Sequence, residues 1–402
     1  MSSQQRRYDL DWLRIIAFGL LIFYHIGMFY VSWGFHVKSV HAGPEIEPLM
    51  KLINPWRMTV LFLISGVALR HAMDKAPLGN FAWARFWRLF LPLVFGMLVV
   101  VAPQSWLELL EKGETTASFG GFYPEYLSAS TDYSIILPTW NHLWYVAYLI
   151  VYTFILIGLY PLVTRVSRHL SPLKGKTPVL FAVVAIAPVG IFALNDIWLE
   201  DMYPSTHALV DDWGNHALYF PFLLTAFLIA KSVRVWQIVD RLFVPAVVIA
   251  TTLAMWQLFV WSLNDADLRD VAFIEVIAIA HMMVVPIYAW ACILVALGLV
   301  RRFANAPSRA LNYMTEAIFP WYILHQTFIV IFGFWLTRQG LTPFIEFSLL
   351  TGLTFAACFI AHEYVIRRSN ILRPFFGLKQ KRAKSGKTAT RSPAQTGSAT
   401  IT

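Results

Sequence analysis

Two ionisable residues lie within the first apolar segment of this sequence, Arg14 and His25. Eleven positions separate them, just over three helical turns, so both side chains project from nearly the same face, about 16 Å apart along the axis. A neutral imidazole can take a proton, and a guanidinium can hold an anion. The alternative is a snorkelling arginine and a histidine bonded to its neighbours. Because both lie on one face, the pair favours a functional role.

A second set of basic residues follows the second apolar segment. Arg85 and Arg88 are three positions apart and share one face of a helix, and Arg70 ends the preceding segment. Guanidinium groups suit bidentate binding of phosphate. Plain anchoring of a membrane helix by cytoplasmic positive charge is the alternative interpretation.

A third set, Asn141-His142-Leu143-Trp144-Tyr145, begins another apolar segment. Polar groups among aromatic rings could hold a sugar, although an ordinary interfacial aromatic belt explains the rings equally well. Other ionisable residues lie in or beside apolar segments, and each on its own is better explained as a packed polar residue: His216, Glu275, His281, Glu316, His325, Glu346 and His362. The histidines show no paired helical spacing, which disfavours a metal enzyme.

Long apolar helices must position these residues. Of the 402 residues, 58% are hydrophobic and only 14% are charged, against roughly a quarter charged in soluble domains. A span needs about 20 mainly apolar residues. Ten segments qualify: 12–33, 51–69, 87–107, 142–163, 178–195, 216–231, 242–263, 271–300, 317–337 and 343–366. Arg57 weakens the second, the sixth is short, and the eighth is long enough to tilt or to break near Pro286.

The distribution of charge predicts the orientation of these spans. With the N-terminus in the cytoplasm, the inner segments carry 25 of the 32 Lys and Arg residues and the outer segments carry six. The net charge of +9 is therefore mainly a topology signal, and nucleic acid is not an expected partner. We predict an all-α polytopic protein in three parts: a cytoplasmic N-terminus (1–11), a ten-helix membrane domain (12–370) and a disordered basic cytoplasmic tail (371–402).

These motifs resemble the membrane acyltransferase 3 family. The family's arginine, ten residues and histidine are matched by Arg14 and His25, and its Arg-x-x-Arg motif by Arg85 and Arg88. The resemblance spans about residues 8–370 and continues through these runs: Tyr8 to Arg14, Trp56-Arg57-Met58, Phe62 to Gly66, His142 to Tyr145 and Tyr322 to His325. Within the family, Phe35-His36-Val37, the run from Trp56 to Gly66 and Tyr219 to Phe222 look most like the branch that succinylates periplasmic glucans.

The resemblance implies transfer of an acyl group, acetyl or succinyl, from cytoplasmic acyl-CoA to a hydroxyl of an extracytoplasmic carbohydrate. Arg85, Arg88 and Arg70, with Arg14, would hold the donor's phosphates at the inner mouth. His25 would act as general base on the hydroxyl, or accept the acyl group itself. His142, Trp144, Tyr145 and His325 would contact the acceptor. No metal is expected.

Two rival interpretations stay open from the sequence. A transporter or flippase of a glycan or small polar solute would use the same buried polar groups as a pathway, but it would not need the arginine pair. A non-catalytic membrane subunit would tolerate loss of both Arg14 and His25. The expected protein is a multi-pass acyltransferase of the cytoplasmic (inner) membrane of a bacterium, in contact with lipid, acyl-CoA, a glycan and possible glycan-synthesis proteins.

Overall fold

The computed structural model describes residues 6–169, 177–263 and 271–381, and every regular element in these ranges is helical. The elements are α1 (Tyr8–Met28), α2 (Glu47–Met73), α3 (Leu78–Phe95), η1 (Gly96–Val100), α4 (Ala102–Glu111), α5 (Phe119–Leu127), η2 (Asn141–Leu143), α6 (Trp144–Gly158), α7 (Tyr160–His169), α8 (Thr177–Ala185), α9 (Ala187–Leu194), η4 (Asn195–Leu199), α10 (Glu200–Met202), α11 (Trp213–Ile229), α12 (Val233–Ser262), α13 (Val271–Phe303), α14 (Arg309–Leu336), α15 (Pro343–Ile360), η6 (Ala361–Ile366) and α16 (Leu372–Phe375). The all-α prediction is confirmed.

The predicted spans correspond to these helices. Among the described residues, nine helical runs are long and apolar enough to cross a membrane. The tenth predicted span, 216–231, is α11, which has 17 residues. Two of the nine runs each consist of three or more consecutive elements. The run Leu78–Glu111 contains α3, η1 and α4, and the run Pro178–Met202 extends from α8 to α10. Helix α13 continues through Pro286 without the break considered above. The chain is a polytopic membrane protein.

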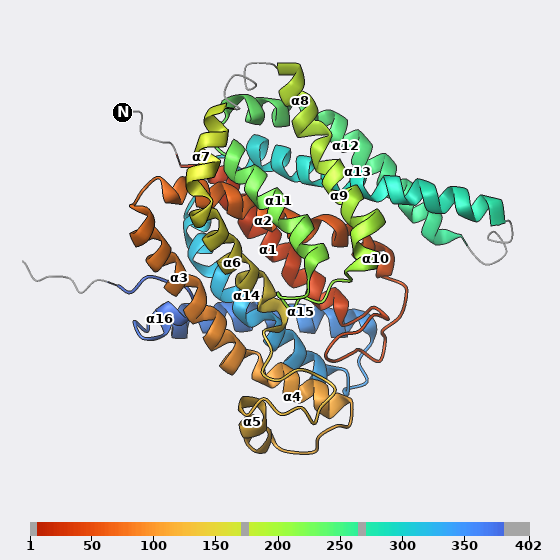
Figure 1. Ribbon diagram of the computed structural model, residues 1–402. Coiled ribbons are helices and arrows are strands. Elements are labelled where there is room, and N and C mark those ends of the chain that lie inside the picture. The colour runs from red at the N-terminus through yellow and green to blue at the C-terminus, as the bar shows by residue number, and fades with distance from the viewer. Residues whose placement is uncertain (1–5, 170–176, 264–270, 382–402) are drawn as a thin grey trace, which may run out of the picture.

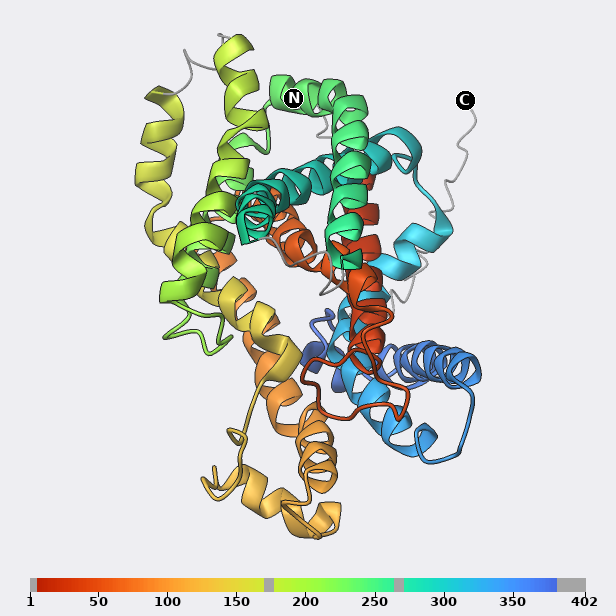
Figure 2. The same ribbon diagram turned by 90° about the vertical axis from the view of Figure 1, so that its right-hand side faces the viewer.

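Helix α1 lies at the centre of the bundle, where it packs against α2, α13, α14 and α15. In Figure 2, α1 (red) lies between α7 to α9 (yellow-green) on the left and α15 (blue) on the right, and α14 (light blue) passes close to it. Its buried residues are almost all apolar and include Leu13, Phe18 and Ile22. Ile16 and Phe23 on another face of α1 are exposed. Where α1 packs against its neighbouring helices, its polar side chains meet protein rather than lipid.

Helices α12 and α13 form a long antiparallel pair that projects beyond the rest of the bundle (Figure 1). Only 17% of the apolar window of α12 is buried inside the protein, and large side chains such as Val244, Val248 and Phe259 are exposed. Apolar surface of this extent is expected to contact lipid. The exposed face of α12 is therefore on the outside of the bundle.

The connections between helices form two separate groups. In the group predicted to be cytoplasmic, ion pairs join Lys231 to Asp74 and Arg301 to Asp240. In the group predicted to be outside, Arg338 pairs with Glu111. Among the described residues, no ion pair joins the two groups, and α5 and α7 lie at opposite ends of the molecule (Figure 1). This arrangement agrees with alternating spans, while the side that faces the cytoplasm stays a prediction from charge.

The first part of the predicted tail is ordered, which differs from the expectation for 371–402. Residues 371–381 include α16, and Phe375 and Phe376 pack against the ring of Phe95 in α3. Arg373 is buried and pairs with Glu316 at 3.1 Å. Aromatic burial and this ion pair attach the segment to the bundle. The remainder of the predicted tail, 382–402, lies outside the described residues.

Candidate active site

A cavity of about 940 Å³ lies on the predicted outer side of the bundle, and His25 and His142 both line it. Its walls include parts of α1, α2, η2, α6, α11 and α14, the run from α9 to α10, and the connections that contain residues 35–36, 136–140 and 205–208. The cavity also has polar and aromatic lining residues that suit a carbohydrate: Tyr24, Trp140, Asn141, Trp144, Asp196, Glu200, Asn215 and Tyr219. Two residue sets predicted separately, on α1 and at the start of α6, therefore meet in one space.

His25 makes a direct hydrogen bond to His325, with Nδ1 and Nε2 separated by 2.7 Å. The rings are stacked, with centroids 5.0 Å apart. On its other side, His325 Nδ1 lies 2.7 Å from the carbonyl oxygen of Tyr322. A carbonyl only accepts, so His325 carries its proton on Nδ1 and its Nε2 accepts from His25 Nδ1–H. Neutral His25 thus keeps the lone pair of Nε2 available as a base.

His142 completes a group of three imidazoles. Its ring centroid lies 5.1 Å from that of His325 and 6.2 Å from that of His25. His142 Nε2 donates to the carbonyl oxygen of Ile323 at 3.1 Å, and Tyr322 Oη donates to the carbonyl oxygen of His142 at 2.5 Å. His142 Nδ1 is buried and has no hydrogen-bond partner. His142 and His325 are thereby tied to the backbone of the same helical turn of α14.

The neighbours Trp144 and Tyr145 point to different places. Trp144 lines the cavity, with its ring 4.5 Å from that of His207 and 5.7 Å from that of Tyr219. Tyr145 is absent from the lining, and its hydroxyl lies 2.6 Å from Ser65 Oγ. The sequence placed both in an acceptor site, but successive helical residues diverge by about 100°. Of the four residues predicted to contact the acceptor, His142 and Trp144 line the cavity, whereas Tyr145 and His325 do not.

Arg14, Arg85 and Arg88 form the group predicted for an anionic donor. The three positive charges are close enough to interact, and Tyr145 lies within range of Arg14 and Arg85. The Nε atoms of Arg14 and Arg85 are buried without a hydrogen-bond partner. Arg88 Nε donates to the carbonyl oxygen of Gly377 at 3.2 Å. Such a concentration of positive charge, only partly neutralised, suits an anion.

Arg70 was predicted to belong to this group, but its contacts are elsewhere. It pairs with Asp74 at 3.6 Å, and its guanidinium lies over the ring of Phe227, 5.4 Å from the centroid. Its Nη1 also lies 3.5 Å from Tyr160 Oη. Because Arg70 is close in sequence to Arg85 and Arg88, we expected all three side chains to lie at the same inner end of the site. The end of α2 instead turns Arg70 toward α7 and α11. Its contacts indicate a structural role in joining these helices.

A layer of aromatic rings lies between the arginine group and the cavity. Phe18 contacts Tyr322 at 4.9 Å and Tyr145 at 6.0 Å between ring centroids, and all three side chains are buried. The lining of the cavity includes none of the three arginines. Helix α1 is continuous from Arg14 to His25, so the spacing of about 16 Å predicted from helical rise is retained. The arginine group and His25 therefore lie toward different ends of α1, with Phe18 between them in the helix.

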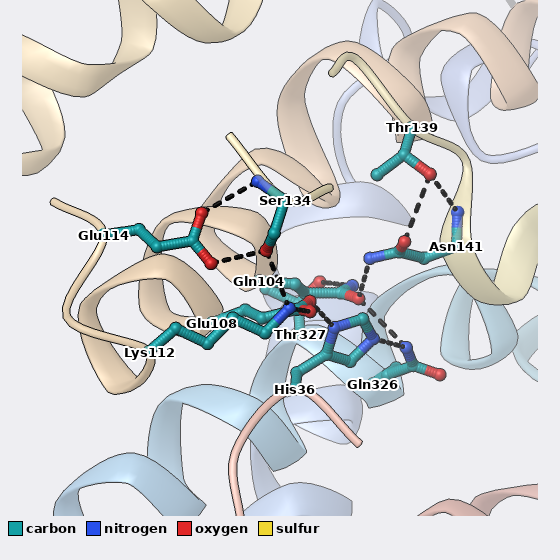
Figure 3. Close-up of polar contacts among 10 residues, drawn as sticks. All are labelled: His36, Gln104, Glu108, Lys112, Glu114, Ser134, Thr139, Asn141, Gln326 and Thr327. Atoms are coloured by element: carbon teal, nitrogen blue, oxygen red, sulfur yellow. Dashed lines mark hydrogen bonds and ion pairs between the residues drawn. The ribbon is translucent and has the colours of Figure 1, made fainter. Parts of the chain in front are cut away.

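A polar network, shown in Figure 3, was not predicted from the sequence. His36 Nδ1 donates to Glu108 at 2.5 Å, and the amide of Gln326 donates to His36 Nε2 at 2.8 Å. The same amide contacts Gln104 Oε1 at 3.1 Å, which also accepts from Asn141 Nδ2 at 3.1 Å. Gln326 adjoins His325 and Asn141 adjoins His142. The network therefore joins the chain beside His142 to the chain beside His325, and only a polar residue within an apolar run, Gln104, signalled it.

The connection between α10 and α11 covers part of the cavity and is held by Asp212, which is fully buried. Asp212 accepts from the backbone amides of Thr206 and His207, each at 3.0 Å, from Asn215 at 2.9 Å and from the hydroxyl of Tyr148. Burial alone would raise the pKa of Asp212, but these hydrogen bonds lower it below its usual value. The carboxylate thus keeps its charge and fixes the segment that carries His207 over Trp144.

Comparison with known families agrees with this geometry. The profile of a family described as an acyltransferase domain matches residues 7–363. Curated relatives include the glucans biosynthesis protein C of Shigella dysenteriae serotype 1 (strain Sd197), 23% identical over 364 residues, and that of Escherichia coli (strain K12), 22% identical over 364 residues. Each alignment covers 87% of this chain and 89% of the relative.

A comparison with solved structures gives no match. The family profile itself spans α1 to α15 and reaches into η6, so it contains both the histidine group and the arginine group. The chain belongs to the acyltransferase family and is a membrane acyltransferase.

Proposed function

We propose that this protein transfers an acyl group, acetyl or succinyl, from cytoplasmic acyl-CoA to a hydroxyl of an extracytoplasmic carbohydrate such as a periplasmic glucan. The observation that carries the proposal is His25, whose hydrogen bond to His325 leaves Nε2 basic at the wall of the outer cavity. The two relatives named above are called glucans biosynthesis protein C, which favours a glucan as acceptor. In this proposal the protein lies in the inner membrane of a bacterium.

The proposed reaction needs one proton acceptor and one activated acyl group. The acceptor hydroxyl attacks the thioester carbonyl, and His25 Nε2 takes its proton as the new ester bond forms. The carbon–sulfur bond breaks, and the proton passes from His25 to the departing thiolate, which gives free CoA. In the alternative with a covalent intermediate, Nε2 attacks the thioester carbonyl, the carbon–sulfur bond breaks and the CoA thiolate leaves. The acceptor hydroxyl then attacks the acyl-imidazole, the carbon–nitrogen bond breaks to give the ester and free Nε2, and the hydroxyl proton ends on the CoA thiolate.

The arginine group is the proposed site for the phosphates of the donor. Arg14, Arg85 and Arg88 would hold the nucleotide end by bidentate contacts. The extended arm of the donor would then follow α1 toward His25, a distance of about 16 Å. Phe18 and its aromatic neighbours stand on this path, so their displacement is part of the proposed donor binding.

The proposal is tested with membranes that contain wild-type protein or the His25→Ala variant, supplied with labelled acetyl-CoA or succinyl-CoA and with glucan. Loss of a general base predicts a fall of about 10² to 10⁴-fold in ester formation. His41→Ala is the matched control, because His41 lies in an outer connection and bonds to the carbonyl oxygen of Leu341 instead of lining the cavity.

Wild-type transfer rates in a correctly inserted His25→Ala variant would exclude the proposed role of His25. Movement of glycan across the membrane without ester formation would instead support the transporter interpretation. Mass spectrometry of the glucan product identifies the acyl group, because acetyl and succinyl additions differ in mass.

A further inference from the structure

Arg57 is a basic side chain inside the outer cavity, which it lines together with His25. It lies in α2, and its guanidinium carbon is 3.7 Å from the ring centroid of Tyr24, the residue before His25. Its Nη1 donates to the backbone carbonyl of Asn54 at 3.0 Å and to the side-chain oxygen of Asn54. Its Nε is buried and has no hydrogen-bond partner. The guanidinium is thus held in place with donors that protein groups do not use.

Arg57 differs in its contacts from the other basic residues of the outer segments that the structure describes. Lys51 pairs with Glu47, Lys112 with Glu108 and Arg338 with Glu111. Lys38 donates to two backbone carbonyl oxygens, at 2.7 and 2.8 Å. Among the described residues, no carboxylate lies within 4.0 Å of the Arg57 guanidinium, although Asp196 and Glu200 line the same cavity.

A charged group without a counter-ion is costly in a membrane-embedded site and is retained where it binds something. Stacking on Tyr24 stabilises the cation and fixes the plane of its fork of donors. A planar fork of this kind matches a carboxylate, which it can bind through two parallel hydrogen bonds. The stacking partner Tyr24 adjoins His25, so the bound carboxylate would lie beside the proposed base.

We infer that Arg57 is a carboxylate-binding site for a substrate in the outer cavity. The inference rests on the proposed function and makes its substrate class more specific. Two substrates could carry the carboxylate to this position: the far end of a dicarboxylic acyl group on its way to the hydroxyl, or an acidic sugar in the acceptor. In either case Arg57 selects for negative charge near His25 and is a specificity-determining residue.

The first test measures binding and does not depend on acyl transfer. Detergent-purified protein is heated with increasing monomethyl succinate, with its neutral counterpart dimethyl succinate, and with glucuronic acid or glucose. We expect only the carboxylates to raise the unfolding temperature of the wild type. Arg57→Gln should need at least a tenfold higher concentration of the effective carboxylate for the same rise. Lys51→Gln, one basic residue earlier on α2 and outside the lining, should match the wild type. Equal stabilisation of wild type and Arg57→Gln would overturn the inference.

The second test separates the two sources of the carboxylate. If the acyl group carries it, Arg57→Gln lowers transfer from succinyl-CoA to neutral glucan at least tenfold and leaves transfer from acetyl-CoA within twofold. If the acceptor carries it, Arg57→Gln lowers transfer from both donors to an acidic glycan and leaves transfer to neutral glucan unchanged. Arg57→Lys keeps the charge without the planar fork and should lie between wild type and Arg57→Gln.

The outcomes also distinguish this inference from the proposed function. Arg57→Gln could leave acyl transfer unchanged, or lower it equally for every donor and acceptor. Either result would contradict the inferred carboxylate site but not the proposed acyltransferase function. Arg57-dependent binding of carboxylate without ester formation from any donor would support the site and contradict the proposed function. A monodisperse elution profile for each variant shows that the comparison is made between folded proteins.

Discussion

At the scale of single residues, the environment of His25 defines what the site can do. A general base needs a partner that fixes its tautomer, and carboxylates commonly serve this purpose. Here His325 takes that place, and the carbonyl oxygen of Tyr322 in turn sets the tautomer of His325. Both partners belong to one turn of α14, so a neutral chain of hydrogen bonds orients the imidazole of His25. This arrangement avoids placing a carboxylate's negative charge against the proposed base inside the membrane.

We predict that His325→Phe lowers the turnover rate of acyl transfer by about 10²-fold, because the imidazole of His25 loses the acceptor that orients it. The apparent KM for acyl-CoA should stay unchanged, since the arginine group is untouched. His325→Gln offers an amide oxygen at a similar position and should restore part of the rate. Steady-state kinetics on the three proteins checks this; equal rates for the Phe and Gln variants would contradict a positioning role.

At the scale of elements, the crossing of α2 and α11 supports one wall of the cavity. Gly66 of α2 faces α11 so closely that a Cβ there would lie 2.1 Å from the backbone oxygen of Leu223 and 3.0 Å from the Cβ of Ala226. Small residues allow this close approach of membrane helices. The same two helices carry the cavity residues Arg57 and Tyr219, so the crossing sets their spacing.

We predict that Gly66→Val destabilises the protein by about 1–3 kcal/mol, because backbone must shift to admit the side chain. Gly19→Val, in the middle of α1, should be tolerated, since nothing lies within 4 Å of a Cβ at that position. The temperature at which each detergent-solubilised variant loses its monodisperse peak measures the difference. Equal thermal stability of the two variants would show that α2 and α11 can separate without cost.

The connection over the cavity gives a prediction about pH. The pKa of Asp212 is lowered in the folded protein, so its contribution to stability is fully present above the unfolded value of about 3.9 and is lost as the pH falls below that value. Its neighbours are all donors, so Asp212→Asn places an amide donor against them and should release the segment even at neutral pH.

Hydrogen exchange at the amides of Thr206 and His207 checks this prediction. We expect protection in the wild type between pH 5 and 8, with a decline near pH 4 after correction for intrinsic rates, and faster exchange in Asp212→Asn at pH 7. Asp211→Asn is the control, because Asp211 is exposed. Unchanged protection in Asp212→Asn would mean that other contacts hold the segment.

At the scale of the whole molecule, the charged residues of the connections lie in two groups at opposite ends of the bundle. Ion pairs form within each end, and the cavity and the arginine group lie toward different ends of α1. The positive-inside pattern predicts that the arginine group faces the cytoplasm, where an acyl-CoA donor would be available. The orientation of the protein is therefore as important to its function as the identity of its residues.

We predict that Thr131→Cys reacts with a membrane-impermeant maleimide in intact cells and that Lys75→Cys reacts only after lysis. Both positions are exposed, on connections assigned to opposite sides. The variants are made with Cys292 and Cys358 replaced by serine, so that each carries a single thiol. Labelling of Lys75→Cys in intact cells would reverse the predicted orientation.

The sequence by itself determined the all-helical class, the positions of the long apolar segments and the spacing of Arg14 and His25. These are local properties: span length follows from bilayer thickness, and the shared face follows from helical periodicity. Tail residues 371–381 were misjudged because their packing depends on Phe95 and Glu316, far away in the chain. Arg70 and Tyr145 make their contacts away from the groups to which the sequence assigned them, because neighbours in sequence can point in different directions around a helix.

Only the tertiary structure decided which polar groups meet. His25 and His325 lie 300 positions apart, and the network through His36, Glu108 and Gln326 joins an outer connection, α4 and α14. Periodicity indicates which face of a helix carries a residue, but it does not specify the neighbouring helix or the register between them. Those follow from packing over the whole bundle, where close crossings such as that at Gly66 set the distances between side chains. Packing thereby brought separate polar residues together around one cavity, which holds an oriented imidazole and an arginine with no carboxylate partner in the described part of the chain.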